Sequence, residues 1–419
     1  MPVELSEADW SRLNGEFGEA AALATRILVQ TAGVMGAERL IDVASAHVDG
    51  CLYHGLAGLE FAERLVAGGA RVSIPTTLNV ASLDLLHPER PPGDPDSAAK
   101  ARRQMDLYVE MGCRPTWTCA PYQLPERPAF GQHVAWAESN AIVFCNTVLG
   151  ARTNRYGDFI DICAAIAGRA PLAGLHLDRE RLARLVLRVD GVSPRLLESD
   201  ALYPVLGHLL GRQAGGAVAA IVGLPARTDE DRLKAIGAAA ASSGSIAMFH
   251  AVGITPEAPT LAAATGGEDA AEVVVTTERL RAARDELETA TGHALGAVSV
   301  GTPHASVAEL ERLAALVEGR RPVLPFYVNT ARDVLAEAEG RDWFASLPAA
   351  GVEIVTDTCT YLTPIMDVGR GPVMTDSGKW AWYAPANIGM DVVIGGLEEC
   401  VASAVAGRLV RDESLWTDG

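Results

Sequence analysis

Three cysteines share one kind of position in this sequence. Cys119 lies in TWTCAPYQ, Cys145 in FCNT and Cys359 in DTCT, each at or beyond the end of an apolar, strand-like run and beside Thr or Asn. Thiolates hold iron-sulfur clusters, and nearby backbone and hydroxyl donors tune such clusters through hydrogen bonds to the sulfurs. Three thiolate ligands would leave one iron open for chemistry. The wide spacing is no ligand motif by itself, so inert burial stays open for each cysteine.

Other cysteines occupy different surroundings. Cys163 and Cys400 lie within helical patterns and are predicted to be packing residues. Cys51 lies in HVDGCLYHG, a loop whose polar residues could face a ligand. Those polar residues are His47, Asp49, Tyr53 and His54.

Cationic and hydroxyl side chains that suit an anion gather in three other loops. Arg152 and Arg155 in GARTNRYGD stand about one helical turn apart, which suits a carboxylate, although a solvated pair is the alternative. Ser377 and Lys379 in MTDSGKWAWYAP could hold an anion, but the spacing of a P-loop is missing. His304 in GTPHAS could be an acid, a base or an anion contact, whereas a structural hydrogen bond is the alternative.

The elements that must position these loops alternate along the chain. Short runs of Val, Ile and Ala alternate with helical patterns, which predicts layered α/β domains with strands covered by helices. The strand 296–300 precedes GTPHAS and a helix with Ser306 and Glu309 as a capping box. The same order recurs at 322–340, where Thr330 is the predicted helix cap, and at 351–364. Sites of such domains form in the loops that leave the strand ends.

Composition limits the class of ligand. The 419 residues are 49% hydrophobic and 21% charged, with a net charge of -18. Such a charge argues against nucleic-acid backbones and anionic membranes, and it favours a small polar substrate. The uncharged stretch 235–254 is predicted to be a helix, a turn and a buried strand. The acidic start of the chain is unlike a secretory signal, so a cytoplasmic protein is expected.

Three regions are predicted from composition and pattern. Region 1–172 carries Cys119 and Cys145, region 173–294 is a simpler α/β stretch, and region 295–419 carries Cys359 and the SGK sequence. The interval 87–100 is rich in Pro, Gly and Asp, which predicts an exposed loop.

Several long segments together resemble the large, catalytic part of aconitase X. They are HVDGCLYHGLAGLEFAERL, PTTLNVASLD, TCAPY, ESNAIVFCNTVLGARTNRYGDF, GTPHAS, DTC and TDSGKWAWYAPANIGMDVVIGGLEECVASAV. The similarity covers nearly the whole chain. It implies an aconitase-like fold with several layered α/β domains around a central cleft. Members of this superfamily are hydro-lyases in which an iron centre acts as Lewis acid on a leaving hydroxyl.

Carried over residue by residue, the resemblance implies a complete site. Cys119, Cys145 and Cys359 become ligands of an iron-sulfur cluster with two or four irons. The substrate-binding residues it implies are Asn146, Arg152, Asn154, Arg155 and Lys379. The candidate catalytic residues are His54, Ser377 and His304. The family also has a small swivelling domain, expected here as a separate small subunit in a heterodimer. That expectation leaves the base open, because a serine of the swivelling domain takes the proton in the wider superfamily.

The resemblance implies dehydration of a small hydroxy acid. The expected reaction converts cis-3-hydroxy-L-proline to 1-pyrroline-2-carboxylate, since HVDGCLYHG resembles the bacterial hydroxyproline branch. One alternative is a phosphomevalonate dehydratase, which should need more cationic or backbone donors. An alternative of another class is an aconitase-related regulator that binds RNA, which the acidic charge opposes.

Overall fold

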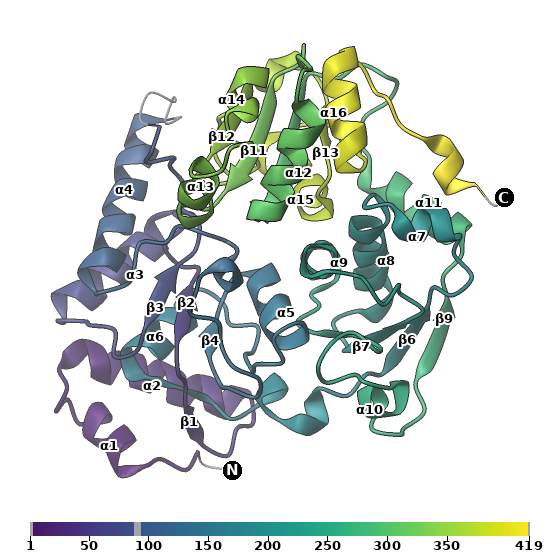
Figure 1. Cartoon of the computed structure of the whole chain (residues 1–419). Helices are drawn as coiled ribbons and strands as arrows, with labels where there is room; N and C mark the ends of the chain where they lie inside the picture. Colours follow the sequence, from purple (N-terminus) through teal and green to yellow (C-terminus); the bar gives the residue numbers. More distant parts are fainter. Residues whose placement is uncertain (1–2, 88–93, 418–419) are drawn as a thin grey trace. The chain divides into compact units, whose positions relative to one another are not determined.

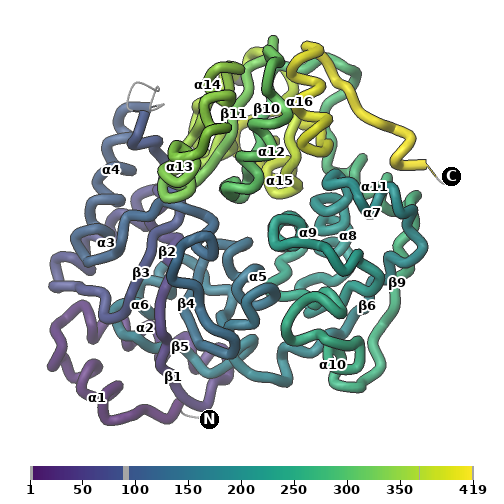
Figure 2. The backbone as a smooth tube through the Cα atoms, in the orientation of Figure 1, coloured from purple at the N-terminus to yellow at the C-terminus, as the bar shows by residue number. Residues whose placement is uncertain are grey.

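The structure is a computed structural model that describes residues 3–87 and 94–417. The described chain falls into two compact units (Figures 1 and 2), the first within residues 1–83 and 92–182 and the second within residues 84–91 and 183–419. Among the described helices, none combines the length and the apolar character needed to cross a bilayer.

The first unit contains two small sheets with helices around them. Its elements are α1 (Glu7–Leu13), α2 (Glu19–Val34), β1 (Leu40–Asp42), β2 (Ala46–Val48), α3 (Leu56–Ala67), β3 (Thr76–Leu78), α4 (Pro95–Glu110), η1 (Pro121–Gln123), β4 (Ala135–Trp136), α5 (Ser139–Thr147), α6 (Ile160–Ala167), β5 (Arg169–Pro171), η2 (Gly174–His176) and η3 (Asp178–Glu180). Strands β3, β2 and β4 pair in that order and run parallel, whereas β1 and β5 pair antiparallel.

The second unit contains two larger parallel sheets. Its elements are β6 (Leu185–Arg188), α7 (Pro194–Glu198), α8 (Leu202–Ala214), β7 (Ala219–Val222), α9 (Glu230–Gly244), β8 (Phe249–Ala251), α10 (Leu261–Thr265), β9 (Ala271–Val274), α11 (Thr277–Leu287), β10 (Ala297–Ala305), α12 (Val307–Val317), β11 (Phe326–Thr330), α13 (Arg332–Glu339), α14 (Ser346–Ala350), β12 (Val352–Val355), η4 (Val368–Arg370), β13 (Val373–Thr375), α15 (Gly378–Ile388), β14 (Val392–Ile394), α16 (Leu397–Ala406) and η5 (Glu413–Trp416).

Strand order in the second unit explains its apolar strands. One sheet has the order β8-β7-β6-β9 and the other the order β12-β11-β10-β13-β14, with all pairs parallel. Inner parallel strands are covered on both faces, so β7, β10 and β11 are buried along nearly their whole length, whereas the edge strand β9 is mostly exposed. The second sheet shares a core with α12, α13, α14 and α16, while α15 contacts β10, β13 and β14. The predicted layered α/β class is confirmed.

Local predictions held where the signal lay within a few residues. Ser306 and Glu309 form the predicted capping box of α12, and the stretch 235–254 is the end of α9, a turn and β8. Cys163 and Cys400 lie in α6 and α16 as predicted, and both side chains are buried.

Three local predictions were wrong. The apolar run before Cys145 is helix α5 and not a strand, because a fully buried run has no amphipathic period to distinguish the two. Ala331 and not Thr330 is the N-cap of α13, since the Thr330 hydroxyl donates to the carbonyl of Ala305 in the neighbouring strand at 2.9 Å. Part of the predicted loop 87–100 is the first turn of α4, which begins at Pro95, while residues 88–93 lie outside the described residues.

Candidate active site

The loop that carries Cys359 follows β12 and is buried along its whole length from Thr356 to Thr360. Buried loops need partners for their polar groups, and hydroxyls supply them here. The Thr358 and Thr363 hydroxyls lie 2.6 Å apart. The Thr360 hydroxyl lies 2.7 Å from that of Ser299 and accepts from Trp380 Nε1 at 2.9 Å. The cysteine therefore sits on a rigid, hydroxyl-rich support.

Asn329 at the end of β11 anchors this loop to the sheet. Its Oδ1 accepts from the Thr360 amide at 3.0 Å, and its Nδ2 donates to the carbonyl of Val300 at 2.9 Å. Next to it, the pairing of β10 with β11 shifts register between Val300 and Ala305. Gly301 allows this irregularity, because it has a φ of +78° and a Cβ there would lie 2.4 Å from the Asn329 carbonyl oxygen.

Asp357 holds the other side of the loop. It is fully buried and adopts a φ of 63°, which is strained for a residue other than glycine. Arg332 Nε and Nη2 donate to its two carboxylate oxygens at 2.5 and 2.7 Å, and the amide of Leu85 donates at 2.9 Å. Burial raises the pKa of Asp357, although Arg332 opposes this. Asp84 adds a contact from the Thr356 hydroxyl at 3.1 Å.

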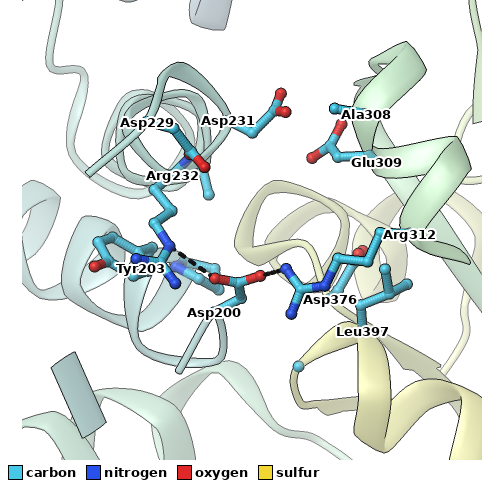
Figure 3. Close-up of a pocket in the computed structure, with 13 residues that line it drawn as sticks. Asp200, Tyr203, Asp229, Asp231, Arg232, Ala308, Glu309, Arg312, Asp376 and Leu397 are labelled. Carbon is cyan, nitrogen blue, oxygen red and sulfur yellow. Dashed lines mark hydrogen bonds and ion pairs between the residues drawn. The ribbon is translucent and has the colours of Figure 1, made fainter. Parts of the chain in front are cut away.

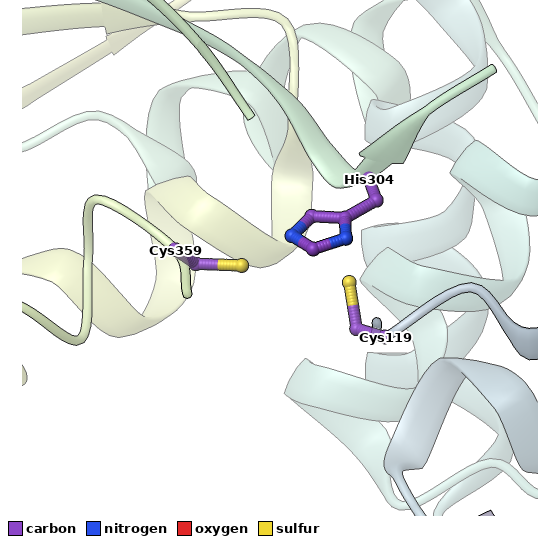
Figure 4. A group of neighbouring side chains, drawn as sticks. All are labelled: Cys119, His304 and Cys359. Carbon is purple, nitrogen blue, oxygen red and sulfur yellow. The ribbon is translucent and has the colours of Figure 1, made fainter. Parts of the chain in front are cut away.

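His304 at the end of β10 lies beside Cys359 (Figure 4). The nearest metal-binding atoms of these two side chains are within 4.8 Å of each other. His304 Nε2 is 3.1 Å from the carbonyl of Thr358. Burial lowers the pKa of His304, the charges of Lys379 and Lys234 act in the same direction, and the resulting pKa is about 4. A neutral imidazole beside a thiol is a donor set that suits iron, zinc or an iron-sulfur cluster. Cys119, which Figure 4 also labels, belongs to the first unit.

Ser377 and Lys379 begin helix α15. The Ser377 hydroxyl caps this helix by accepting from the Trp380 amide at 3.0 Å, and both side chains are buried. Gly378 between them is required by close packing, since a Cβ there would lie 2.8 Å from the Cβ of Ala239. The predicted SGK loop is therefore a helix N-terminus packed on α9.

A pocket opens to solvent in the second unit (Figure 3). Asp200 lies between Arg232 and Arg312 and pairs with both, and Arg312 also pairs with Glu398, so both arginines are already held in ion pairs. The other charged residues that line the pocket are Asp229, Asp231, Glu309 and Asp376. The pocket is therefore acidic. Burial raises the pKa of Asp376 to about 6.

A smaller pocket brings Ser377 together with Lys234, Glu309 and Asp376. Lys234 is buried and pairs with Glu309 and with Asp231, the latter at 2.9 Å. Lys234 was missed by sequence reasoning, because nothing in its helical pattern distinguishes it from a surface lysine. Its burial follows from the packing of α9 against β10 and α15.

In the first unit, Cys119 follows a segment that runs beside β3. The Thr118 amide donates to the carbonyl of Leu78 at 3.2 Å, and the Cys119 carbonyl accepts from Asn140 Nδ2 at 2.8 Å. Trp117 has a φ of 45°, a strained value just before the cysteine. Cys119 is thus fixed from both sides of its backbone.

Cys145 lies in α5 within an apolar cluster that includes Tyr122, Trp136 and Phe144. Burial raises the pKa of its thiol, so this cysteine is protonated unless a metal binds it. Helix α5 is capped by Glu138, whose Oε2 accepts from the amides of Asn140 and Ala141 at 2.9 Å each.

Two predicted substrate ligands make internal contacts. Asn146 Oδ1 accepts from the Thr153 amide and from Arg181 Nη1, both at 3.0 Å, while its Nδ2 donates to the Thr153 carbonyl at 2.9 Å. Asn154 Oδ1 accepts from the Leu175 amide at 2.8 Å. Both side chains are buried, so they shape the loop after α5.

The two predicted arginines differ in exposure. Arg152 is partly buried, donates to the carbonyl of His176 at 3.0 Å and pairs with Asp178. Arg155 is exposed. His176 lies 2.9 Å from His133 and 2.7 Å from the Tyr156 hydroxyl, measured between hydrogen-bonding atoms. Burial lowers the pKa of His176 to about 3, so it is neutral.

The HVDGCLYHG loop places its polar residues differently from one another. His54 is exposed just before α3, whereas His47 and Cys51 are buried. Asp49 is partly buried and accepts from Asn79 Nδ2. Asp161 holds this turn, because its Oδ2 accepts from the amides of Asp49 and Gly50 at 2.7 and 3.2 Å.

Comparisons with known proteins give the chain its family. Profiles of the aconitase X first, second and third domains match residues 2–179, 183–285 and 295–406. A relative from Pseudomonas aeruginosa, named cis-3-hydroxy-L-proline dehydratase, is 46% identical over 98% of this chain and 72% of its own length. The chain belongs to the aconitase X family.

Other members of the aconitase X family extend the comparison. A phosphomevalonate dehydratase large subunit from Methanothermobacter thermautotrophicus is 38% identical over 93% of this chain and 96% of its own length. The crystal structure of Thermococcus kodakaraensis aconitase X in its holo-form superposes with a TM-score of 0.86. It is 33% identical and covers 96% of this chain and 100% of that one.

The aconitase X domain profiles and the compact units divide the chain differently, because the second unit contains the second-domain and third-domain profiles together with a short segment of the first-domain profile. Residues 84–87 fall within the first-domain profile, yet by their contacts they group with the second unit. The hydrogen bonds from Leu85 to Asp357 and from Thr356 to Asp84 explain this. A first-domain segment thus supports the cysteine loop of the third aconitase X domain.

Proposed function

We propose that this chain is the catalytic part of a hydro-lyase that dehydrates cis-3-hydroxy-L-proline. The observation that carries the proposal is the 46% identity to the Pseudomonas cis-3-hydroxy-L-proline dehydratase over 98% of the chain. In the reaction, the C2 proton and the C3 hydroxyl leave as water. The resulting enamine tautomerises to 1-pyrroline-2-carboxylate.

The proposed cofactor is an iron-sulfur cluster with two or four irons, held by Cys119, Cys145 and Cys359. The buried thiol of Cys359 beside the neutral imidazole of His304 supports a metal in this region of the second unit. When bound, an iron with an open position acts as Lewis acid toward the leaving hydroxyl. A cysteine must be deprotonated to bind a metal. Burial raises the pKa of Cys145 and so favours the thiol, and only a bound metal would stabilise the thiolate.

The chain's own residues have two proposed tasks. Arg152, Arg155 and Lys379 bind the substrate carboxylate, and Asn146 and Asn154 fix the loop that presents the arginines. A bound carboxylate makes the C2 proton easier to remove, because the cations stabilise the charge that develops. His304 is buried and neutral, which makes it a poor proton donor. Ser377 and His54 stay candidates for proton transfer.

A separate small subunit is part of the proposal. The Methanothermobacter relative carries the words large subunit in its name, which supports a two-subunit enzyme. In the heterodimer, the small subunit would supply the base and close the site against water. A cytoplasmic location is also proposed, since none of the seven cysteines forms a disulfide in the described chain and cluster ligands need a reducing compartment.

A test uses protein made anaerobically with its co-encoded small partner. We expect iron and acid-labile sulfide in the complex, turnover of cis-3-hydroxy-L-proline, and saturable activation as the partner is titrated toward one-to-one stoichiometry. Turnover of phosphomevalonate instead would establish the second candidate, which the 38% identity to that dehydratase supports. Turnover of neither compound by an iron-loaded complex would overturn the proposal.

A further inference from the structure

Three acidic or amide side chains meet at one edge of the β3-β2-β4 sheet. Asp49 directly follows β2, Asn79 directly follows β3, and Glu138 follows β4 by two residues. Val48 pairs with Leu78, and His47 pairs with Trp136, so these parallel strands end side by side. Cys119 follows the segment whose Thr118 amide bonds to Leu78, which places it beyond the same edge. Ligand sites in parallel sheets lie at the carboxyl ends of the strands.

Asn79 has a buried acceptor without a donor. Its side chain is 2% exposed, its Nδ2 donates to Asp49, and its Oδ1 has no hydrogen-bond partner among the described residues. An unsatisfied buried acceptor destabilises a fold, so such groups in native proteins point to a missing donor. Because the amide is bonded to Asp49, its free oxygen lies beside that carboxylate.

Asp49 lacks a cationic partner in the described part of the chain. Burial and the charges of the carboxylates of Glu138, Asp158 and Asp161 together raise the pKa of Asp49 to about 7. In the residues that the structure describes, no three of these carboxylates converge closely enough to ligate one metal ion. A ligand that brings positive charge and two N–H donors would satisfy both Asp49 and the Asn79 oxygen.

We infer that Asp49 and Asn79 form a subsite for the protonated secondary amine of a cyclic amino acid. The inference rests on the proposed function and deepens it. A protonated proline ring has two N–H groups, one for each acceptor, whereas phosphomevalonate has no nitrogen. This subsite would select the amino-acid substrate over the phosphorylated hydroxy acid. Glu138 acts on it through charge, since its Oε2 already caps α5.

The experiment compares two inhibitors that differ in one ring atom. L-Proline carries the amine, and tetrahydrofuran-2-carboxylate has an ether oxygen in its place. Inhibition constants are measured with the iron-loaded heterodimer of the wild type and of Asp49→Asn and Asn79→Ala. The control is Asp42→Asn, because the Asp42 side chain is 91% exposed in β1 of the same unit.

We expect the wild type to prefer L-proline, and Asp49→Asn to reduce that preference about tenfold or more, since hydrogen bonds to charged groups are the strong ones. Asn79→Ala should shift the preference in the same direction by a smaller factor. Binding of the ether analogue and iron content should stay at the wild-type level in both variants. Asp42→Asn should match the wild type throughout.

Two results separate this inference from the proposed function. If the wild type dehydrates cis-3-hydroxy-L-proline but Asp49→Asn and Asn79→Ala keep the full preference for L-proline, the amine subsite is wrong and the proposed function stands. If the enzyme fails to dehydrate that substrate yet prefers L-proline through Asp49, the subsite stands and the proposed substrate is wrong.

Discussion

Replacing Arg332 tests whether its pair with Asp357 holds the Cys359 loop. Arg332→Leu would remove both guanidinium donors from the fully buried carboxylate of Asp357, which would keep the hydrogen bond from the Leu85 amide. Breaking a buried ion pair from one side costs about 3–5 kcal/mol. The Arg332 side chain is 31% exposed, so water can partly replace it and we expect about 3 kcal/mol, near the lower limit. Arg332→Lys should cost about 1–2 kcal/mol, because lysine keeps the charge but loses the fork.

The assay has two readouts. Urea unfolding gives the stability of each variant, and the rate of thiol labelling at Cys359 in metal-free protein reports opening of the loop. Both should change in Arg332→Leu, with the labelling rate rising. The matched control is Arg341→Leu, because Arg341 Nη2 pairs with Oε1 of the surface residue Glu337 at 2.6 Å. Loss of this surface pair should cost no more than about 1 kcal/mol. Equal effects in Arg332→Leu and Arg341→Leu, with unchanged labelling of Cys359, would refute the positioning role.

Three further predictions concern the cysteines, Lys234 and Asp9. Serine variants of the proposed ligands Cys119, Cys145 and Cys359 should each lose iron and activity. Serine variants of the packing residues Cys163 and Cys400 should keep both, and full iron content in the ligand variants would contradict the assignment. Lys234→Met should lower the free energy of unfolding by about 3 kcal/mol at neutral pH, because it leaves the carboxylates of Asp231 and Glu309 without their cation. An unchanged midpoint of urea unfolding would show that this ion-pair network adds nothing to stability. Burial raises the pKa of Asp9, but hydrogen bonds from Ser6 and the charge of Arg169 outweigh it and hold the pKa below its ordinary value. The contribution of ionised Asp9 to stability should therefore be present above the ordinary pKa of an aspartate and lost as pH falls through the pKa in the folded state. Between about pH 5 and 2, Asp9→Asn should lose less stability than the wild type. Parallel acid unfolding curves of the two proteins would disprove this.

Sequence alone was sufficient for features that depend on neighbouring residues. The capping box of Ser306 and Glu309 closes over three residues, and the helix, turn and strand of 235–254 follow from a local change in pattern. The α/β class follows from the alternation of such elements. The long segments around the cysteines also sufficed for the aconitase X family, because a match of that length is specific whatever the fold.

Tertiary structure decided what depends on which strands and helices are neighbours. Asp84 and Thr356 are 272 residues apart, and their hydrogen bond exists because a first-domain segment packs against the third-domain loop. Asp49 meets Asn79 because β2 pairs with β3, an order that no local pattern encodes. Lys234 is buried by the packing of α9, and the run before Cys145 is a helix, although its composition suits a strand equally well. Local hydrogen bonds are determined by residues a few positions apart, whereas burial and long-range pairing depend on the arrangement of the whole chain.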